Sequence, residues 1–152
     1  MQPRLNAHVL NPEPYRRQVA MEKYLSESPL DATIKHLVKI RASQINGCAY
    51  CIDMHSKDAR AAGETEQRLY GLSAWREAPY YTDRERAALE WTEAVTLLTE
   101  GHVPDDVFNR VRQHFTDKEL VELNFAVIVI NAYNRIAVPF RTVAGTYQRA
   151  AM

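Results

Sequence analysis

The chain has 152 residues, of which 46% are hydrophobic and 25% are charged, the usual balance of a globular protein. Its 19 Lys and Arg residues equal its 19 Asp and Glu residues in number, so the formal net charge is zero. That neutrality argues against nucleic-acid binding and against a polybasic membrane anchor, because both need a concentrated basic surface. We expect one domain over residues 1–152.

The apolar segments are too short to predict a membrane or secreted protein. The longest apolar run lies near residues 125–130, far short of the roughly 20 residues of a spanning helix. Residues 1–6 lack the apolar core of a signal peptide. We therefore expect a cytoplasmic protein without membrane contact. Permanent structural disulfides are rare in that compartment, so the only two cysteines, with two residues between them, indicate catalysis or metal binding.

Helix-start signals follow one another along the first part of the chain. The sequence of residues 11–14 predicts a helix that reaches about Leu25. Ser28 is expected to cap a second helix with Pro29 at its first position, and apolar residues then recur at helical spacing as far as Ile45. Two helices therefore precede the cysteine pair.

A break at Asn46 and Gly47 separates the second helix from the cysteines. We expect Asn46 to cap a third helix, which runs from about Gly47 to Ala62 and ends at Gly63. A shorter helix is expected over residues 65–72. This placement puts the first cysteine in the first turn of its helix.

Two capping boxes mark the second half of the chain, Thr82 with Glu85 and Thr116 with Glu119. Each is expected to open a helix, and a further helix lies between them. The last helix is long and very apolar, and Pro139 should kink or end it. No segment alternates with period two, so we predict an all-α fold of six to seven helices.

Cys48, Cys51 and His55 are the residues whose spacing indicates chemistry. Offsets of three and four place them within an arc of roughly 60° on one helical face. The two Cα atoms would then lie about 5 Å apart, which permits a disulfide. The positive end of the helix stabilises a thiolate at Cys48, while His55 can accept and return a proton, so the set resembles a nucleophile with its base.

Three other interpretations of the cysteines remain open at this point. Zinc would find only three ligands in Cys-x-x-Cys plus His, whereas a structural zinc site has four, and the remaining histidines are scattered. Both cysteines could instead be buried apolar residues of the core. A thioredoxin-type domain would need strands around the motif, and the sequence predicts none.

The cysteine motif resembles that of the AhpD-like alkylhydroperoxidase family, within the carboxymuconolactone decarboxylase superfamily. The resemblance rests on LVKIRASQINGCAYCIDMH at residues 37–55 and on NAYNRIAVPFR at residues 131–141, and it spans roughly residues 15–145. It implies an all-α fold with the Cys-x-x-Cys at the start of a core helix, assembled as trimers or hexamers. It also implies a dithiol that reduces hydroperoxides weakly, or recycles the disulfide of a partner peroxidase. We expect no metal, because only three ligands converge, and no cofactor.

The family's site carries over directly onto Cys48, Cys51 and His55, but two further positions depart from its better-known form. Tyr50 stands where that form has a second histidine, and a phenol is a poor base near neutral pH. His36, twelve residues before Cys48, stands where the family usually has a glutamate. A neutral imidazole would then replace a carboxylate in the proton relay.

The leading prediction is a peroxidase-related thiol–disulfide oxidoreductase that needs an external reductant. The alternatives are a decarboxylase of the carboxymuconolactone type, which does not require a cysteine pair, and an oligomeric binding protein without catalysis. The sequence leaves open which cysteine attacks first. The helix dipole favours Cys48, and the contact with His55 favours Cys51.

Overall fold

The computed structural model describes residues 2–149, and this part of the chain is all-α, with nine α-helices, one 3-10 helix and no strand. The helices are α1 (Ala7–Leu10), α2 (Pro12–Glu27), α3 (Ala32–Ile45), α4 (Ala49–Ala61), α5 (Glu66–Tyr70), η1 (Gly71–Ala74), α6 (Asp83–Thr96), α7 (Leu98–Gly101), α8 (Asp105–Val111) and α9 (Asp117–Phe140). The all-α prediction is confirmed. The expected six to seven helices omitted α1 and α7, which are single turns of four residues.

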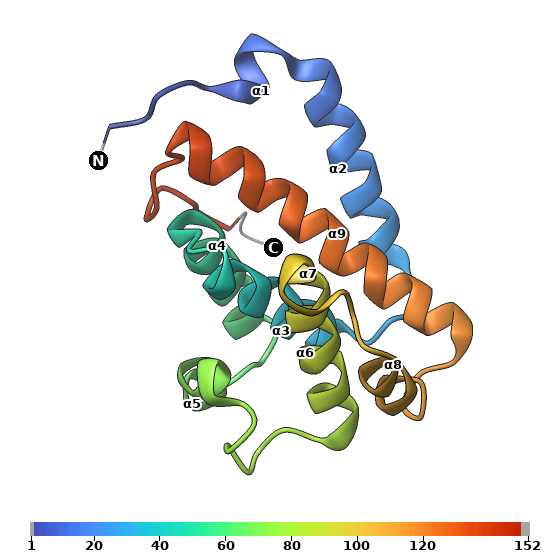
Figure 1. Ribbon diagram of the computed structural model, residues 1–152. Helices are drawn as coiled ribbons and strands as arrows, with labels where there is room; N and C mark the ends of the chain where they lie inside the picture. The colour runs from blue at the N-terminus through green and yellow to red at the C-terminus, as the bar shows by residue number, and fades with distance from the viewer. Residues whose placement is uncertain (1, 150–152) are drawn as a thin grey trace.

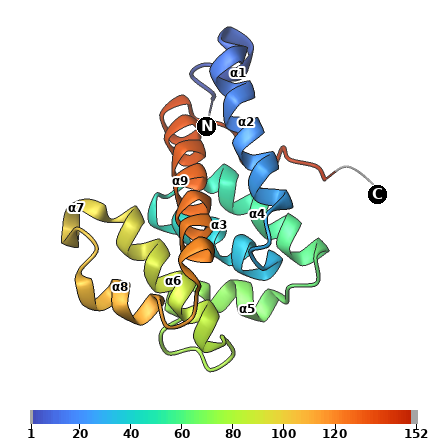
Figure 2. The same cartoon turned by 90° about the vertical axis from the view of Figure 1, so that its right-hand side faces the viewer.

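The helices are arranged around α3, which packs against α4, α6 and α9. The long helix α9 passes across the molecule, and α2 packs against it (Figures 1 and 2). Both predicted capping boxes are present, at the starts of α6 and α9. The helix that carries the cysteines, α4, is therefore held between the central helix α3 and one end of α9.

The start of α3 differs from the prediction. Asp31, not Ser28, is its N-cap, and the Asp31 carboxylate accepts a hydrogen bond from the backbone N–H of Ile34 at 3.1 Å. Ser28 instead ends α2, where its hydroxyl donates to the carbonyl of Leu25 at 2.9 Å. Leu30 is buried in the core before the helix begins, so the nearer acidic residue supplies the cap.

The turn before the cysteines also differs from the prediction. Asn46 ends α3, and Cys48 itself is the N-cap of α4, where its Sγ accepts the backbone N–H of Cys51 at 3.4 Å. Gly47 lies between them at a φ of 65°, a left-handed conformation that suits glycine. The Asn46 side chain is unavailable as a cap because its amide is bound elsewhere.

That amide joins a buried polar cluster between α3 and α9. Nδ2 of Asn46 donates to the side-chain oxygens of Asn131 and Asn134, at 3.0 and 2.8 Å. Asn134, which is 1% exposed, in turn donates to the hydroxyl of Ser43 at 3.1 Å. The backbone N–H of Cys48 donates to the carbonyl of the same serine at 2.9 Å. The last core helix thus fixes the turn from which α4 begins.

The helix α9 is, by length and composition, apolar enough to cross a membrane, yet it forms part of the helical core. It is 24 residues long and ends at Phe140, one residue beyond Pro139. The next residue, Arg141, adopts a left-handed conformation. Pro139 therefore ends the helix, as its sequence position predicts. One side of α9 remains uncovered within the chain, with Val121, Phe125 and Ile128 exposed.

Candidate functional site

The cysteine pair lies at the start of α4 and forms a disulfide. The Cα atoms of Cys48 and Cys51 are 5.4 Å apart, close to the spacing expected from a helical offset of three. Both residues are buried, with 2% and 1% of their surfaces exposed. They pack against Ile130 and Ala137 of α9, so the sulfur atoms are shielded from bulk water on that side.

A cavity of about 660 Å³ adjoins the pair. Its lining comes from both terminal segments and from α2, α3, α4 and α9: Pro3, Arg4, Leu5, Asn6, Ala7, His8, Tyr15, Val19, Glu22, His36, Lys39, Tyr50, Cys51, Met54, His55, Asp58, Tyr133, Ile136, Ala137, Phe140, Thr142 and Val143. Four of the five predicted site residues belong to this lining. Cys48 does not, so only the second cysteine of the pair adjoins this cavity. As the N-cap, Cys48 directs its sulfur to the backbone N–H of Cys51 in the first turn of α4.

His55 lies one helical turn beyond Cys51 and is 7% exposed. Its Nε2 atom is buried and has no hydrogen-bond partner in the described part of the chain. Burial above all, with smaller contributions from the positive charge of Lys39 and from the nearby His36, lowers the pKa of His55 to about 3. The ring is therefore neutral at ordinary pH.

His36 reaches the same cavity from α3, as the twelve-residue spacing predicts for a relay position. Burial, followed by the charge of Lys39, lowers its pKa below the usual value, and its buried Nδ1 has no hydrogen-bond partner among residues 2–149. Tyr50 also lines the cavity, where burial raises its pKa. Both side chains thus bring uncharged polar groups to the cavity that Cys51 faces.

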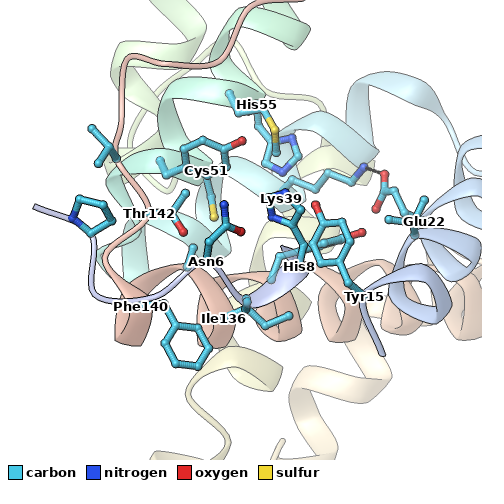
Figure 3. Close-up of a pocket in the computed structure, with 18 of the residues that line it drawn as sticks. Asn6, His8, Tyr15, Glu22, Lys39, Cys51, His55, Ile136, Phe140 and Thr142 are labelled. Carbon is cyan, nitrogen blue, oxygen red and sulfur yellow. Dashed lines mark hydrogen bonds and ion pairs between the residues drawn. The ribbon is translucent and has the colours of Figure 1, made fainter. Parts of the chain in front are cut away.

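The sequence did not identify Lys39 and Glu22, which form an ion pair in the cavity wall. In Figure 3 the Lys39 side chain extends toward Glu22 past the ring of His55. Lys39 follows His36 by three residues, so helical spacing alone places it on the same face of α3. Glu22 comes from α2, and only the packing of that helix brings it to the site.

Both terminal segments close over the cavity. At the N-terminal side, the backbone N–H and the guanidinium of Arg4 donate to the carbonyls of Phe140 and Pro139, at 2.9 and 3.1 Å. At the C-terminal side, the hydroxyl of Tyr147 donates to Asp58 at 2.8 Å. The last carbonyls of a helix have no hydrogen-bond partner within the helix, so the contact of Arg4 with Pro139 and Phe140 also caps the end of α9.

No metal site is evident in the part of the chain that is described. Among residues 2–149, no three His, Cys, Asp or Glu side chains are grouped so that they could hold an ion. The cysteines are used in the disulfide and His55 is buried beside it. That the protein holds no metal and no cofactor remains a prediction, to be tested by measuring the metal and cofactor content of the purified protein.

Comparison with known proteins places this site in a family. The model of the carboxymuconolactone decarboxylase family matches residues 12–94, which include α2 to α5 and both cysteines. The chain belongs to this family. It is 45% identical over 138 residues to YdfG of Bacillus subtilis (strain 168), an uncharacterised protein, and the match covers 91% of this chain and 94% of YdfG.

Two solved structures share the fold of this family member. A protein of unknown function from Agrobacterium tumefaciens, described as a candidate antioxidant defence protein AhpD, is 44% identical with a TM-score of 0.93, over 96% of this chain and 100% of that one. A peroxidase-related protein from Silicibacter sp. TM1040 is 24% identical with a TM-score of 0.81, over 92% and 74%. The AhpD-like fold that the sequence implied is confirmed.

Proposed function

We propose that the chain is a peroxidase-related thiol–disulfide oxidoreductase that uses Cys48 and Cys51 to reduce hydroperoxides. The observation that carries the proposal is the position of Cys51, which lines a cavity together with a neutral His55 one turn away. The similar Agrobacterium protein is described as a candidate antioxidant defence protein AhpD, which supports the same class of reaction. The partner disulfide of another peroxidase is the second substrate that this dithiol chemistry admits.

Attack is assigned to Cys51, because it faces the cavity whereas Cys48 does not. In the reduced protein, His55 accepts the Cys51 proton, and the thiolate attacks the terminal oxygen of R–O–OH. The O–O bond breaks, Cys51 becomes a sulfenic acid, and RO⁻ takes the proton back from His55 to leave as ROH. His36 and Tyr50 supply further polar groups for this proton transfer.

Cys48 then resolves the sulfenic acid. Its thiolate attacks the Cys51 sulfur, hydroxide leaves, and the Cys48 proton completes a molecule of water. The product is the Cys48–Cys51 disulfide, which is the state of the pair in the structure. Overall, two thiols and one hydroperoxide give a disulfide, an alcohol and water, so an external dithiol must return two electrons before the next cycle.

The test follows peroxide consumption and thiol loss in the same sample. Reduced protein mixed with cumene hydroperoxide should lose two thiols for each hydroperoxide consumed. Cys51→Ser should abolish the reaction, whereas Cys48→Ser should stop at a sulfenic acid on Cys51 that dimedone traps. Ser56→Ala, on α4 but outside the cavity lining, is the matched control and should behave as wild type.

The same experiment separates the alternative functions. Peroxide consumption that persists in Cys51→Ser would contradict the proposal. A carboxymuconolactone-type decarboxylase would act on its lactone without either thiol. A binding protein that keeps the cysteines for packing would lose no thiols to peroxide and would label only after denaturation.

A further inference from the structure

The charges that line the cavity cancel one another. Lys39 and Arg4 supply two cations, and Glu22 and Asp58 supply two carboxylates. Arg4 is bound to carbonyls of α9, and Asp58 accepts the hydroxyl of Tyr147. The remaining pair, Lys39 with Glu22, joins α3 to α2 across the cavity wall. Lys39 and Glu22 are thus neutralised by each other, whereas Arg4 and Asp58 are hydrogen-bonded to neutral groups.

The Lys39–Glu22 pair is more enclosed than an ordinary surface ion pair. The Lys39 side chain is 12% exposed and the Glu22 side chain 30% exposed. Apolar and aromatic side chains make up much of the surrounding wall: Tyr15, Val19, Tyr133, Ile136 and Phe140. In such surroundings an unpaired ammonium is costly, and it strongly attracts any anion that enters.

Lys39 is also close to the reacting groups. Its charge is felt by both His36 and His55, which line the same cavity as Cys51 (Figure 3). A molecule that reaches the Cys51 sulfur through the cavity therefore passes within the field of the ammonium. The carboxylate of Glu22 compensates the positive charge of Lys39 as long as the two side chains are paired.

We propose that Glu22 determines the charge specificity of the cavity, because by pairing with Lys39 it favours uncharged molecules over anions at Cys51. Glu22 is a specificity residue and has no part in the chemistry itself. An anion that enters the wild-type cavity leaves water and meets Glu22 beside an ammonium whose charge Glu22 already compensates. The inference rests on the proposed function only in taking hydroperoxides as the natural reactants.

Iodoacetamide and iodoacetate test this selectivity without any turnover. The two reagents have nearly the same size and alkylate the same thiolate, but only iodoacetate carries a negative charge. The Cys48→Ser background leaves Cys51 as the single thiol, since the chain has only two cysteines. Because both reagents alkylate the same thiolate, the ratio of their rates cancels differences in thiolate population. Dividing this ratio by the one measured for glutathione at the same pH removes the difference in intrinsic reactivity between the two reagents.

We expect the wild-type ratio to favour iodoacetamide. Glu22→Gln, which frees Lys39, should shift the ratio toward iodoacetate by about tenfold or more, because unit charges interact strongly in partly enclosed surroundings. Lys39→Met, which leaves Glu22 alone, should shift it the opposite way. The double variant should return close to wild type. Glu27→Gln, an exposed glutamate on the same helix, is the control and should leave the ratio unchanged.

A purely structural link between α2 and α3 would not produce these opposite shifts. Ratios within about twofold of wild type in both single variants would overturn the inference, and unfolding curves identify a variant that has lost its fold. If Glu22→Gln fails to fold, Lys39→Met and the double variant still decide the question.

A second measurement separates this inference from the proposed function. Cumene hydroperoxide and its para-carboxylate differ by one charge, and Glu22→Gln should move the ratio of their kcat/KM values in the same direction as the alkylation ratio. If no hydroperoxide is consumed but the alkylation ratio shifts, the proposed function fails and the charge specificity stands. If both hydroperoxides are consumed and neither ratio responds to Glu22, only the charge specificity fails.

Discussion

His55 is a buried base that the fold keeps uncharged. Burial and the nearby Lys39 lower its pKa from 6.5 to about 3, so the folded protein binds fewer protons than the unfolded chain between these values. The stability that His55 contributes is therefore fully present above pH 6.5 and is lost as the pH falls toward 3. The same burial that keeps the residue uncharged makes the site sensitive to acid.

We predict that His55→Gln removes this pH dependence. Between the two pKa values, the difference in free energy of unfolding between wild type and variant should change by about 1.4 kcal/mol per pH unit. Urea unfolding of the oxidised proteins at a series of pH values measures the difference. Parallel pH profiles for the two proteins would show that His55 does not titrate on unfolding in this range.

His36 gives a prediction about catalysis. Its pKa is lowered by burial and by Lys39, so it can exchange a proton with His55 as a neutral ring, and the acid limb of the activity should lie below pH 6.5. His36→Ala should slow peroxide reduction by about 10²-fold, the lower range of acid–base assistance. His36→Glu should keep activity and move the acid limb downward.

Peroxide consumption by the reduced protein from about pH 5 to about pH 8 measures these effects. His114→Ala, outside the cavity lining, serves as the control. If His36→Ala matches wild type over that whole range, His36 takes no part in the relay.

At the scale of single helices, the polar cluster at the end of α3 determines where α4 begins. Asn134→Leu keeps a similar volume but removes the acceptor of Asn46 and the donor to Ser43. We expect a loss of about 1–3 kcal/mol in the free energy of unfolding, because buried polar partners are left unsatisfied. Urea unfolding measures it, with Asn109→Leu, at an exposed position of α8, as the control. Equal losses in the two variants would mean that the cluster adds no stability.

Local signals in the sequence predicted most helices and the cysteine motif, and tertiary contacts account for what they missed. Thr82 and Thr116 cap their helices as expected, because a capping box is satisfied by residues three apart. Asn46 fails as a cap because α9, far along the chain, binds its amide. Cys48 lies outside the cavity for a related reason, since it takes the cap position itself. Glu22 reaches the site only through the packing of α2.

At the scale of the whole molecule, α9 presents an apolar stripe that no part of residues 2–149 covers. Val121, Phe125 and Ile128, at helical spacing, are 55%, 39% and 45% exposed. The resemblance of the sequence to the AhpD-like family implies a trimer or a hexamer. We expect the stripe to contribute to that interface, because a charge introduced there would be buried on assembly.

Phe125→Glu should therefore reduce the assembly toward the 17.5 kDa monomer at micromolar concentration, as measured by light scattering. Tyr70→Glu, at an exposed position on α5, is the control and should leave the mass unchanged. A wild-type protein that scatters only as a monomer would contradict the prediction.

The disulfide encloses very little chain. Its cysteines are three positions apart, and the entropy that a cross-link removes from an unfolded polypeptide grows with the length of the loop it closes. Loop closure here is worth only about 2 kcal/mol. Urea midpoints measured with and without reductant should accordingly differ by no more than about 1 M. The protein would then gain and lose its cross-link in every cycle without approaching its own unfolding transition.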